Sequence, residues 1–167
     1  HADEIEALGG SGVAAEVGAA SADHLLMIRK TDCEKLAALD TVATLLPATA
    51  FCLCKPYAPA RELIDRGCAV ALASDYNPGS CFTNSIPLLF ALAVIHMKMS
   101  LEEALCALTL NGAAAVGKAD QIGSIEPGKA ADLVVLEKPQ YEYLVYHTAK
   151  NIVREVYKDG NIVYSKR

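Results

Sequence analysis

The chain has 167 residues, 53% of them hydrophobic, and carries a formal net charge of −5. This length suits one packed domain with a small appendage but is too short for a complete eight-unit α/β barrel, which needs about 250 residues. The 15 basic residues are scattered and no apolar run reaches the ~18 residues of a membrane span, so neither nucleic-acid nor membrane partners are expected.

Short apolar segments alternate with helical patterns through the first part of the chain. After a glycine-rich break at 9–12, helices are predicted at 13–17, 31–39 and 59–64, strands at 19–24, 41–46 and 68–74, and a loop at 48–57. The helix at 31–39 opens on the Thr31 to Glu34 spacing of a capping box. The repeated order of strand, loop and helix favours parallel strands joined by right-handed crossovers.

The pattern changes near Asp120. Before it, helices are predicted at 84–97, 101–110 and 112–116, and a capping box from Ser100 to Glu103 opens the second of them. After it come a turn at 123–128, a strand at 132–136, and a hairpin with strands at 151–157 and 161–164. We therefore predict an α/β chain with two parts, a partial (β/α) barrel at 1–120 and a β-strand appendage at 121–167.

The segment 68–80 is the strongest candidate for chemistry. A buried strand ends there in Ser74 and Asp75, and the turn-forming residues Tyr76 to Gly79 follow. Barrels place their catalytic groups at the carboxyl ends of buried parallel strands. The alternative interpretation is that Asp75 only caps its own turn.

Two of the four histidines, His1 and His24, lie where strands should end. Together with Asp75 they could hold a divalent metal ion and leave a position open for water. Glu4 could reach the same place as a proton shuttle or a substrate contact. Each residue also has a structural interpretation, with His1 as a frayed terminus, His24 as a core histidine and Glu4 as a solvated acid.

The six cysteines mostly lie in apolar stretches, where cysteine acts as a small hydrophobic residue. Cys52 and Cys54 do not have the C-x-x-C spacing of a zinc or redox site. Unpaired cysteines are typical of a reducing compartment, so a cytoplasmic location is expected.

Several motifs in this order resemble the imidazolonepropionase family of the amidohydrolase superfamily. The resemblance covers residue 1 to about residue 164, and the segments that carry it are His1–Glu4, Ser21–Leu25, Leu46–Phe51, Ala73–Ser80, Thr109–Ala114 and Gly123–Val134. The last segment is common to many amidohydrolases, whereas the first, second and fourth are more specific. The resemblance implies a TIM-like (β/α)8 metal-dependent hydrolase with a small β-sandwich domain.

The implied reaction belongs to histidine degradation. Water opens the ring of a small-molecule substrate, 4-imidazolone-5-propanoate, to give N-formimidoyl-L-glutamate, with Zn or Fe as cofactor. By position, His1 matches a metal ligand, and Asp75 matches a ligand that also takes a proton from the attacking water. Glu4 and His24 match residues that contact the substrate and assist proton transfer.

The resemblance also assigns a substrate loop, in which Asn77, Gly79 and Ser80 match residues that hold the propanoate and the product. One part of the family pattern is missing, because the His-x-His pair that completes the metal site does not occur here. We therefore expect the carboxy-terminal half of such an enzyme, beginning at the fifth barrel strand and contributing part of a composite sandwich.

The missing amino-terminal half is expected to be a partner in activity, and the chain alone is expected to be inactive. An open half-barrel also exposes an edge and an apolar face, which favours self-association. Two alternatives stay open, another cyclic amidohydrolase or deaminase of the same superfamily and a non-catalytic fragment that assembles with a partner.

Overall fold

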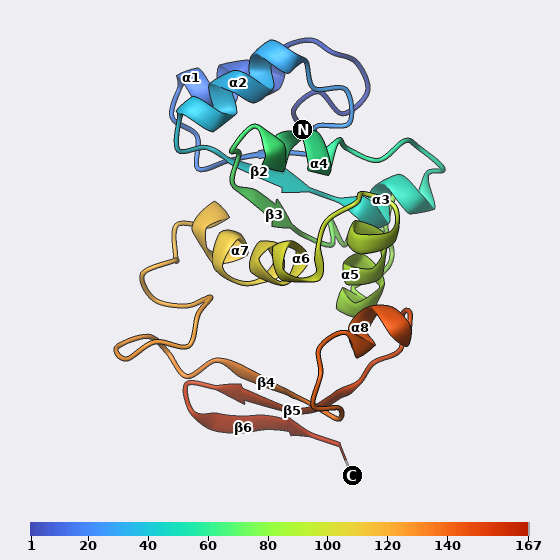
Figure 1. Cartoon of the computed structure of the whole chain (residues 1–167), viewed down its shortest axis with the longest axis vertical. Coiled ribbons are helices and arrows are strands. Elements are labelled where there is room, and N and C mark those ends of the chain that lie inside the picture. Colours follow the sequence, from blue (N-terminus) through green and yellow to red (C-terminus); the bar gives the residue numbers. More distant parts are fainter. Residues whose placement is uncertain (167) are drawn as a thin grey trace.

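The computed structural model describes residues 1–166 and has a mixed α/β architecture, as the sequence predicts (Figure 1). The elements in chain order are α1 (Gly10–Glu16), β1 (Ser21–Asp23), α2 (Lys30–Ala38), β2 (Val42–Leu45), α3 (Pro47–Cys52), α4 (Ala60–Asp65), β3 (Val70–Leu72), α5 (Ile86–Ile95), α6 (Leu101–Leu108), α7 (Leu110–Ala115), β4 (Leu133–Leu136), α8 (Tyr143–Tyr146), β5 (Val153–Lys158) and β6 (Asn161–Ser165).

The first sheet is parallel, with the strand order β1-β2-β3. The predicted parallel strands are therefore confirmed. Ala2 adds a parallel bridge to His24, so the first residues of the chain lie beside the carboxyl end of β1. All four residues of β2 are buried, because this central strand has a neighbour on each side and helices pack on the sheet.

One hydrophobic cluster joins the sheet to the helices. Leu45 of β2 and Leu72 of β3 belong to it, together with Leu36 of α2, Leu63 of α4 and Phe90 of α5. Figure 1 shows α1 and α2 at one end of this sheet and α5, α6 and α7 at the other. This packing leaves the carboxyl ends of the strands to polar side chains.

The second sheet is antiparallel, with the order β4-β5-β6. Asp159 and Gly160 connect β5 and β6 with φ angles of +49° and +77°, which is the backbone of a two-residue hairpin turn. This hairpin is predicted correctly. The sheet lies at the opposite end of the molecule from α1 and α2 (Figure 1), and every residue of β6 is exposed.

Three predictions of secondary structure are wrong. Residues 48–57 do not form a loop throughout, because α3 begins at Pro47, a favourable first helical residue. Thr31 does not cap α2, since Arg29 is the N-cap and no side chain caps the helix. Helix α1 begins inside the predicted glycine break, at Gly10, because a distant carboxylate accepts hydrogen bonds from its first N–H groups.

The capping box at the start of α6 is confirmed. Glu103 donates its backbone N–H to the Ser100 hydroxyl over 3.1 Å, and Ser100 donates its own N–H to the Glu103 carboxylate over 2.7 Å. We expect Ser100→Ala to lower the free energy of unfolding by about 1 kcal/mol in urea denaturation. Ser165→Ala, on the exposed strand β6, is the matched control, and equal effects of the two substitutions would contradict this role.

All six cysteines lie in the described part of the chain and carry free thiols. Cys33, Cys68 and Cys81 are buried as predicted, whereas Cys52 and Cys54 are exposed. Among residues 1–166, no helix is both long and apolar enough to cross a bilayer.

Candidate active site

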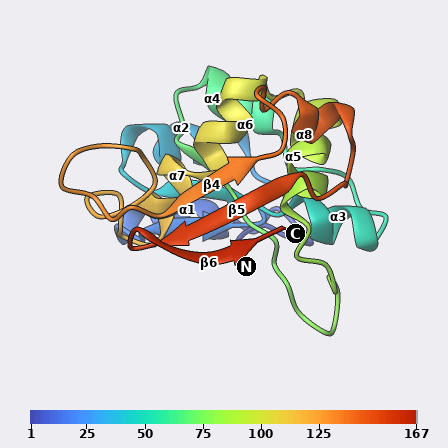
Figure 2. The same cartoon turned by 90° about the horizontal axis from the view of Figure 1, so that it is seen from below.

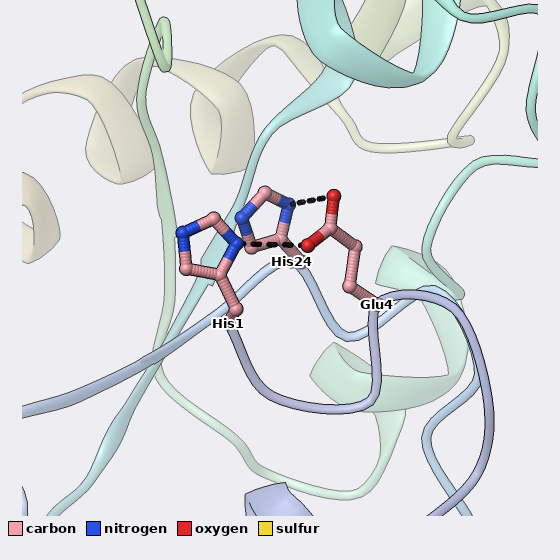
Figure 3. A group of neighbouring side chains, drawn as sticks. All are labelled: His1, Glu4 and His24. Atoms are coloured by element: carbon pink, nitrogen blue, oxygen red, sulfur yellow. Dashed lines mark hydrogen bonds and ion pairs between the residues drawn. The ribbon is translucent and has the colours of Figure 1, made fainter. Parts of the chain in front are cut away.

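Three of the predicted site residues meet at the carboxyl end of β1 (Figure 3). His1 Nδ1 lies 2.8 Å from Glu4 Oε2, and His24 Nδ1 lies 3.6 Å from Glu4 Oε1. The two imidazole rings are stacked, with their centroids 4.5 Å apart. One potential ligand atom from each residue lies within 4.8 Å of the others.

Backbone hydrogen bonds hold this group against the sheet. Ala2 donates its N–H to Asp23 O over 2.9 Å and accepts from the N–H of Leu25 over 3.0 Å, while His24 donates to Thr44 O over 3.0 Å. His24 and Leu25 both have positive φ angles, +79° and +62°. Such angles are uncommon for residues other than glycine, and here they turn the chain so that the His24 ring faces Glu4.

Asp3 fixes the turn between His1 and Glu4. Its buried carboxylate accepts the backbone N–H groups of Gly9, Gly10 and Ser11 at 2.7, 3.1 and 3.0 Å, and it also accepts the Ser11 hydroxyl. Burial acts to raise the pKa of Asp3, but these hydrogen bonds outweigh it and hold the pKa below its usual value. Sequence reasoning missed Asp3, although an aspartate shortly before a glycine-rich turn was an available signal.

Asp75 does not belong to the group formed by His1, Glu4 and His24 in the described structure. Its carboxylate instead accepts a hydrogen bond of 2.7 Å from the Thr49 hydroxyl. Thr49 lies on α3 and was missed because this segment was predicted to be a loop. Since Thr49 also lines a cavity with Glu4 and His24, it connects Asp75 to the other site residues.

The loop after Asp75 is organised by Asn77 rather than by Asp75. The Asn77 side chain accepts the N–H groups of Gly79 and Ser80 at 2.9 and 2.8 Å. Its amide donates to Asp75 O and to the Ser80 hydroxyl at 2.7 and 3.1 Å. Asp75 thus takes part in this turn through its backbone carbonyl, while its carboxylate is bonded to Thr49. The yellow-green segment that follows β3 projects from the body of the chain (Figure 2).

A cavity of about 290 Å³ opens beside the site. It is lined by Glu4, Ile5, His24, Leu26, Met27, Thr49, Ala50, Leu53, Lys55 and Pro56. The polar groups lie on two segments, the carboxyl end of β1 with the start of the chain and α3 with the residues after it. A small molecule with both apolar and polar parts would match this lining.

The family model described as "Amidohydrolase family" matches residues 1–164. The chain belongs to the amidohydrolase family. It is 61% identical to an imidazolonepropionase of Clostridium tetani over 166 residues, which is 99% of this chain and 40% of that protein. It is 60% identical to an imidazolonepropionase of Porphyromonas gingivalis, over 99% of this chain and 39% of that protein. The resemblance stated from the motifs is thus confirmed, and the chain spans about 40% of the length of these curated relatives.

Two solved structures share the fold of this chain. A zinc-bound adenosine deaminase from Xanthomonas campestris superposes with a TM-score of 0.77 and 26% identity, covering 85% of this chain and 36% of that one. An A. niger ochratoxinase superposes with a TM-score of 0.75 and 21% identity, covering 95% and 40%. Because the ochratoxinase is only 21% identical, its likeness to this chain concerns the fold alone.

The donor atoms of this amidohydrolase chain fit a metal ion. Two imidazoles and one carboxylate converge, and this combination suits zinc and similar ions. The Nδ1 atom of His24 is buried and has no hydrogen-bond partner among the described residues, because 3.6 Å to Glu4 is too long for a hydrogen bond. A buried polar atom without a partner is costly, and a bound ligand would satisfy it.

Proposed function

We propose that this chain is the carboxy-terminal part of an imidazolonepropionase, the hydrolase that converts 4-imidazolone-5-propanoate to N-formimidoyl-L-glutamate in histidine degradation. The observation that carries the proposal is the convergence of His1, Glu4 and His24 beside a small cavity. Relatives of that name at 60% identity or more support the substrate. The adenosine deaminase likeness, at 26% identity, supports the alternative substrate class less strongly.

Residues 1–120 would form the carboxy-terminal part of a TIM-like (β/α)8 barrel, and residues 121–167 part of a small β-sandwich. The parallel sheet with polar groups at its carboxyl ends supports the first assignment, and the exposed antiparallel sheet supports the second. The amino-terminal half of the parent would complete both parts. Self-association would cover the remaining open edge, and the free thiols suit a cytoplasmic enzyme.

His1 would be one ligand of the metal ion, zinc or iron, and Asp75, which lies outside the group of His1, Glu4 and His24 in this chain, would join it as a ligand in the complete parent, together with ligands from the rest of that protein. The ion would polarise the ring carbonyl and lower the pKa of the attacking water. The Asp75 carboxylate would accept a proton from that water, and the Thr49 hydroxyl, 2.7 Å from it, would hold the carboxylate in place.

Glu4 and His24 would contact the imidazolone ring and move protons during ring opening. Their placement in the cavity lining supports this role, and the Nδ1 atom of His24 has no hydrogen-bond partner in the described chain and so is available to a substrate. Asn77, Gly79 and Ser80 would hold the propanoate. The hydrogen bonds from the Gly79 and Ser80 N–H groups to the Asn77 side chain connect these three residues within the loop.

The complete parent should hydrolyse 4-imidazolone-5-propanoate, and the 167-residue chain alone should not. The reason is that the His-x-His pair expected to complete the metal site does not occur in this sequence. The measurement is loss of substrate absorbance for both proteins, with and without a chelator, and with adenosine as a control substrate. Chelator-sensitive turnover by the chain alone, or a parent that prefers adenosine, would refute the proposal.

A further inference from the structure

Cys52 and Cys81 bring two thiols together between helix α3 and the loop after β3. Cys81 is buried and packs with Ala48 of α3 and Leu89 of α5. Ala48 and Cys52 are four residues apart on α3, so their side chains lie on one face of that helix. Cys81 therefore packs on the face of α3 that carries Cys52.

The two thiols also act on one another directly. The pKa of the Cys52 thiol is raised, first by partial removal of water from around its sulfur, and then by the charge and a hydrogen bond of the Cys81 thiol. A hydrogen bond between two thiols requires their sulfur atoms to lie near one another. Such proximity is the first condition for a disulfide.

The pair combines an accessible thiol with a shielded one. Cys52 is exposed, whereas Cys81 is only 1% exposed. An oxidant from solvent therefore reaches Cys52 first, and Cys81 is the neighbour that can react with the oxidised sulfur. Cys33 and Cys68, which also lie near one another, are both buried and lack this access.

We propose that Cys52 and Cys81 form a redox modification site, at which hydrogen peroxide produces a disulfide between α3 and the loop after β3. The Cys52 sulfur attacks one peroxide oxygen and the O–O bond breaks, which gives a sulfenic acid and water. The Cys81 sulfur then attacks the Cys52 sulfur, the S–O bond breaks, and a second water leaves with the Cys81 proton. The two thiols lose two electrons in all, and one peroxide is reduced to two waters.

The disulfide would act on the loop that carries Asp75. Cys81 donates its thiol to Ser74 O over 3.2 Å and accepts the Asn77 N–H over 2.9 Å. Helix α3 carries Thr49, whose hydroxyl bonds to the Asp75 carboxylate. Oxidation removes the thiol donor next to Asp75 and joins the loop to the helix that orients its carboxylate. The expected slowing of catalysis rests on the proposed function, whereas the disulfide itself does not.

The test treats the full-length parent with excess hydrogen peroxide, blocks free thiols with N-ethylmaleimide and maps disulfides by mass spectrometry. The wild type should contain a Cys52–Cys81 disulfide that dithiothreitol reduces, and Cys52→Ser should not contain it. Cys54→Ser, which removes the other exposed cysteine near the end of α3, is the matched control and should form the disulfide as the wild type does. A Cys52–Cys54 disulfide, a disulfide between molecules, or a Cys81 that stays blocked by N-ethylmaleimide would overturn the proposal.

Activity measurements separate the modification site from its effect. In the oxidised wild type kcat should fall about tenfold, because small displacements of positioned groups are costly, and it should recover on reduction. Cys52→Ser given the same treatment should keep its kcat, which controls for oxidation of the metal or of methionines. A parent that forms the disulfide but never hydrolyses 4-imidazolone-5-propanoate would refute the proposed function alone. A disulfide that leaves kcat unchanged would overturn the effect on catalysis.

Discussion

Asp75→Asn in the complete parent should lower kcat for imidazolonepropanoate hydrolysis about 1,000-fold, the scale of a lost general base. Asparagine has nearly the same shape and can still accept the hydrogen bond that the Thr49 hydroxyl donates over 2.7 Å. The substitution therefore removes the charge and the proton acceptor with little change in packing. Steady-state kinetics and the metal content of the purified variant are the two measurements.

Thr49→Val is the matched comparison for Asp75→Asn. It keeps the carboxylate but removes the hydroxyl that orients it, so we expect a smaller loss, about tenfold in kcat. If kcat of the Asp75→Asn parent stays within about tenfold of the wild type, Asp75 is not the proton acceptor, whatever the metal content of the variant. Equal losses in both variants would indicate that Thr49 and Asp75 act as one unit.

The predictable parts of the structure are those whose signals are local. The run of small apolar residues before Asp75 marks β3, the Ser100 and Glu103 pair marks the start of α6, and Asp159-Gly160 marks a hairpin. Each of these patterns is set by neighbours a few residues apart, so the sequence contains it in full.

The parts that could not be predicted depend on contacts between distant segments. Helix α3 has only six residues and too weak a helical pattern to show in the sequence, and its buried positions come from packing on the rest of the chain. The meeting of His1 with His24 was expected only in outline, because the left-handed turns at Asp3 and His24 cannot be read from residue types. The Thr49 to Asp75 bond joins residues 26 apart, and no local rule predicts it.

The hydrogen bonds from Gly9, Gly10 and Ser11 to the Asp3 carboxylate are the clearest case of such a distant contact. Their loss should lower the stability of the folded chain. Asp3→Asn should lower the free energy of unfolding by about 2 to 3 kcal/mol at pH 7, because a buried, charged acceptor of several hydrogen bonds is removed. The asparagine amide would also face N–H groups of Gly9, Gly10 or Ser11 that need an acceptor. Urea denaturation of wild type and variant measures the difference, and Asp40→Asn, at an exposed position after α2, is the control.

The pH dependence of this difference gives a second test. Hydrogen bonds lower the pKa of Asp3 in the folded chain, so its charge contributes stability that is fully present above its unfolded pKa of about 3.9. That contribution is lost as the pH falls through the lower folded pKa. The gap between wild type and Asp3→Asn should therefore be constant above about pH 5 and narrow below about pH 4.

Asp3→Asn should also affect the active site, because Asp3 lies between His1 and Glu4 in the chain. Asp3 has a φ angle of +47°, an uncommon conformation that its hydrogen bonds stabilise, and this turn brings Glu4 to within 2.8 Å of His1. In the full-length parent, Asp3→Asn should therefore weaken metal retention during dialysis and lower kcat, while Asp40→Asn changes neither. An Asp3→Asn parent that is less stable but keeps its metal and its kcat would mean that Asp3 supports α1 and does not position the site.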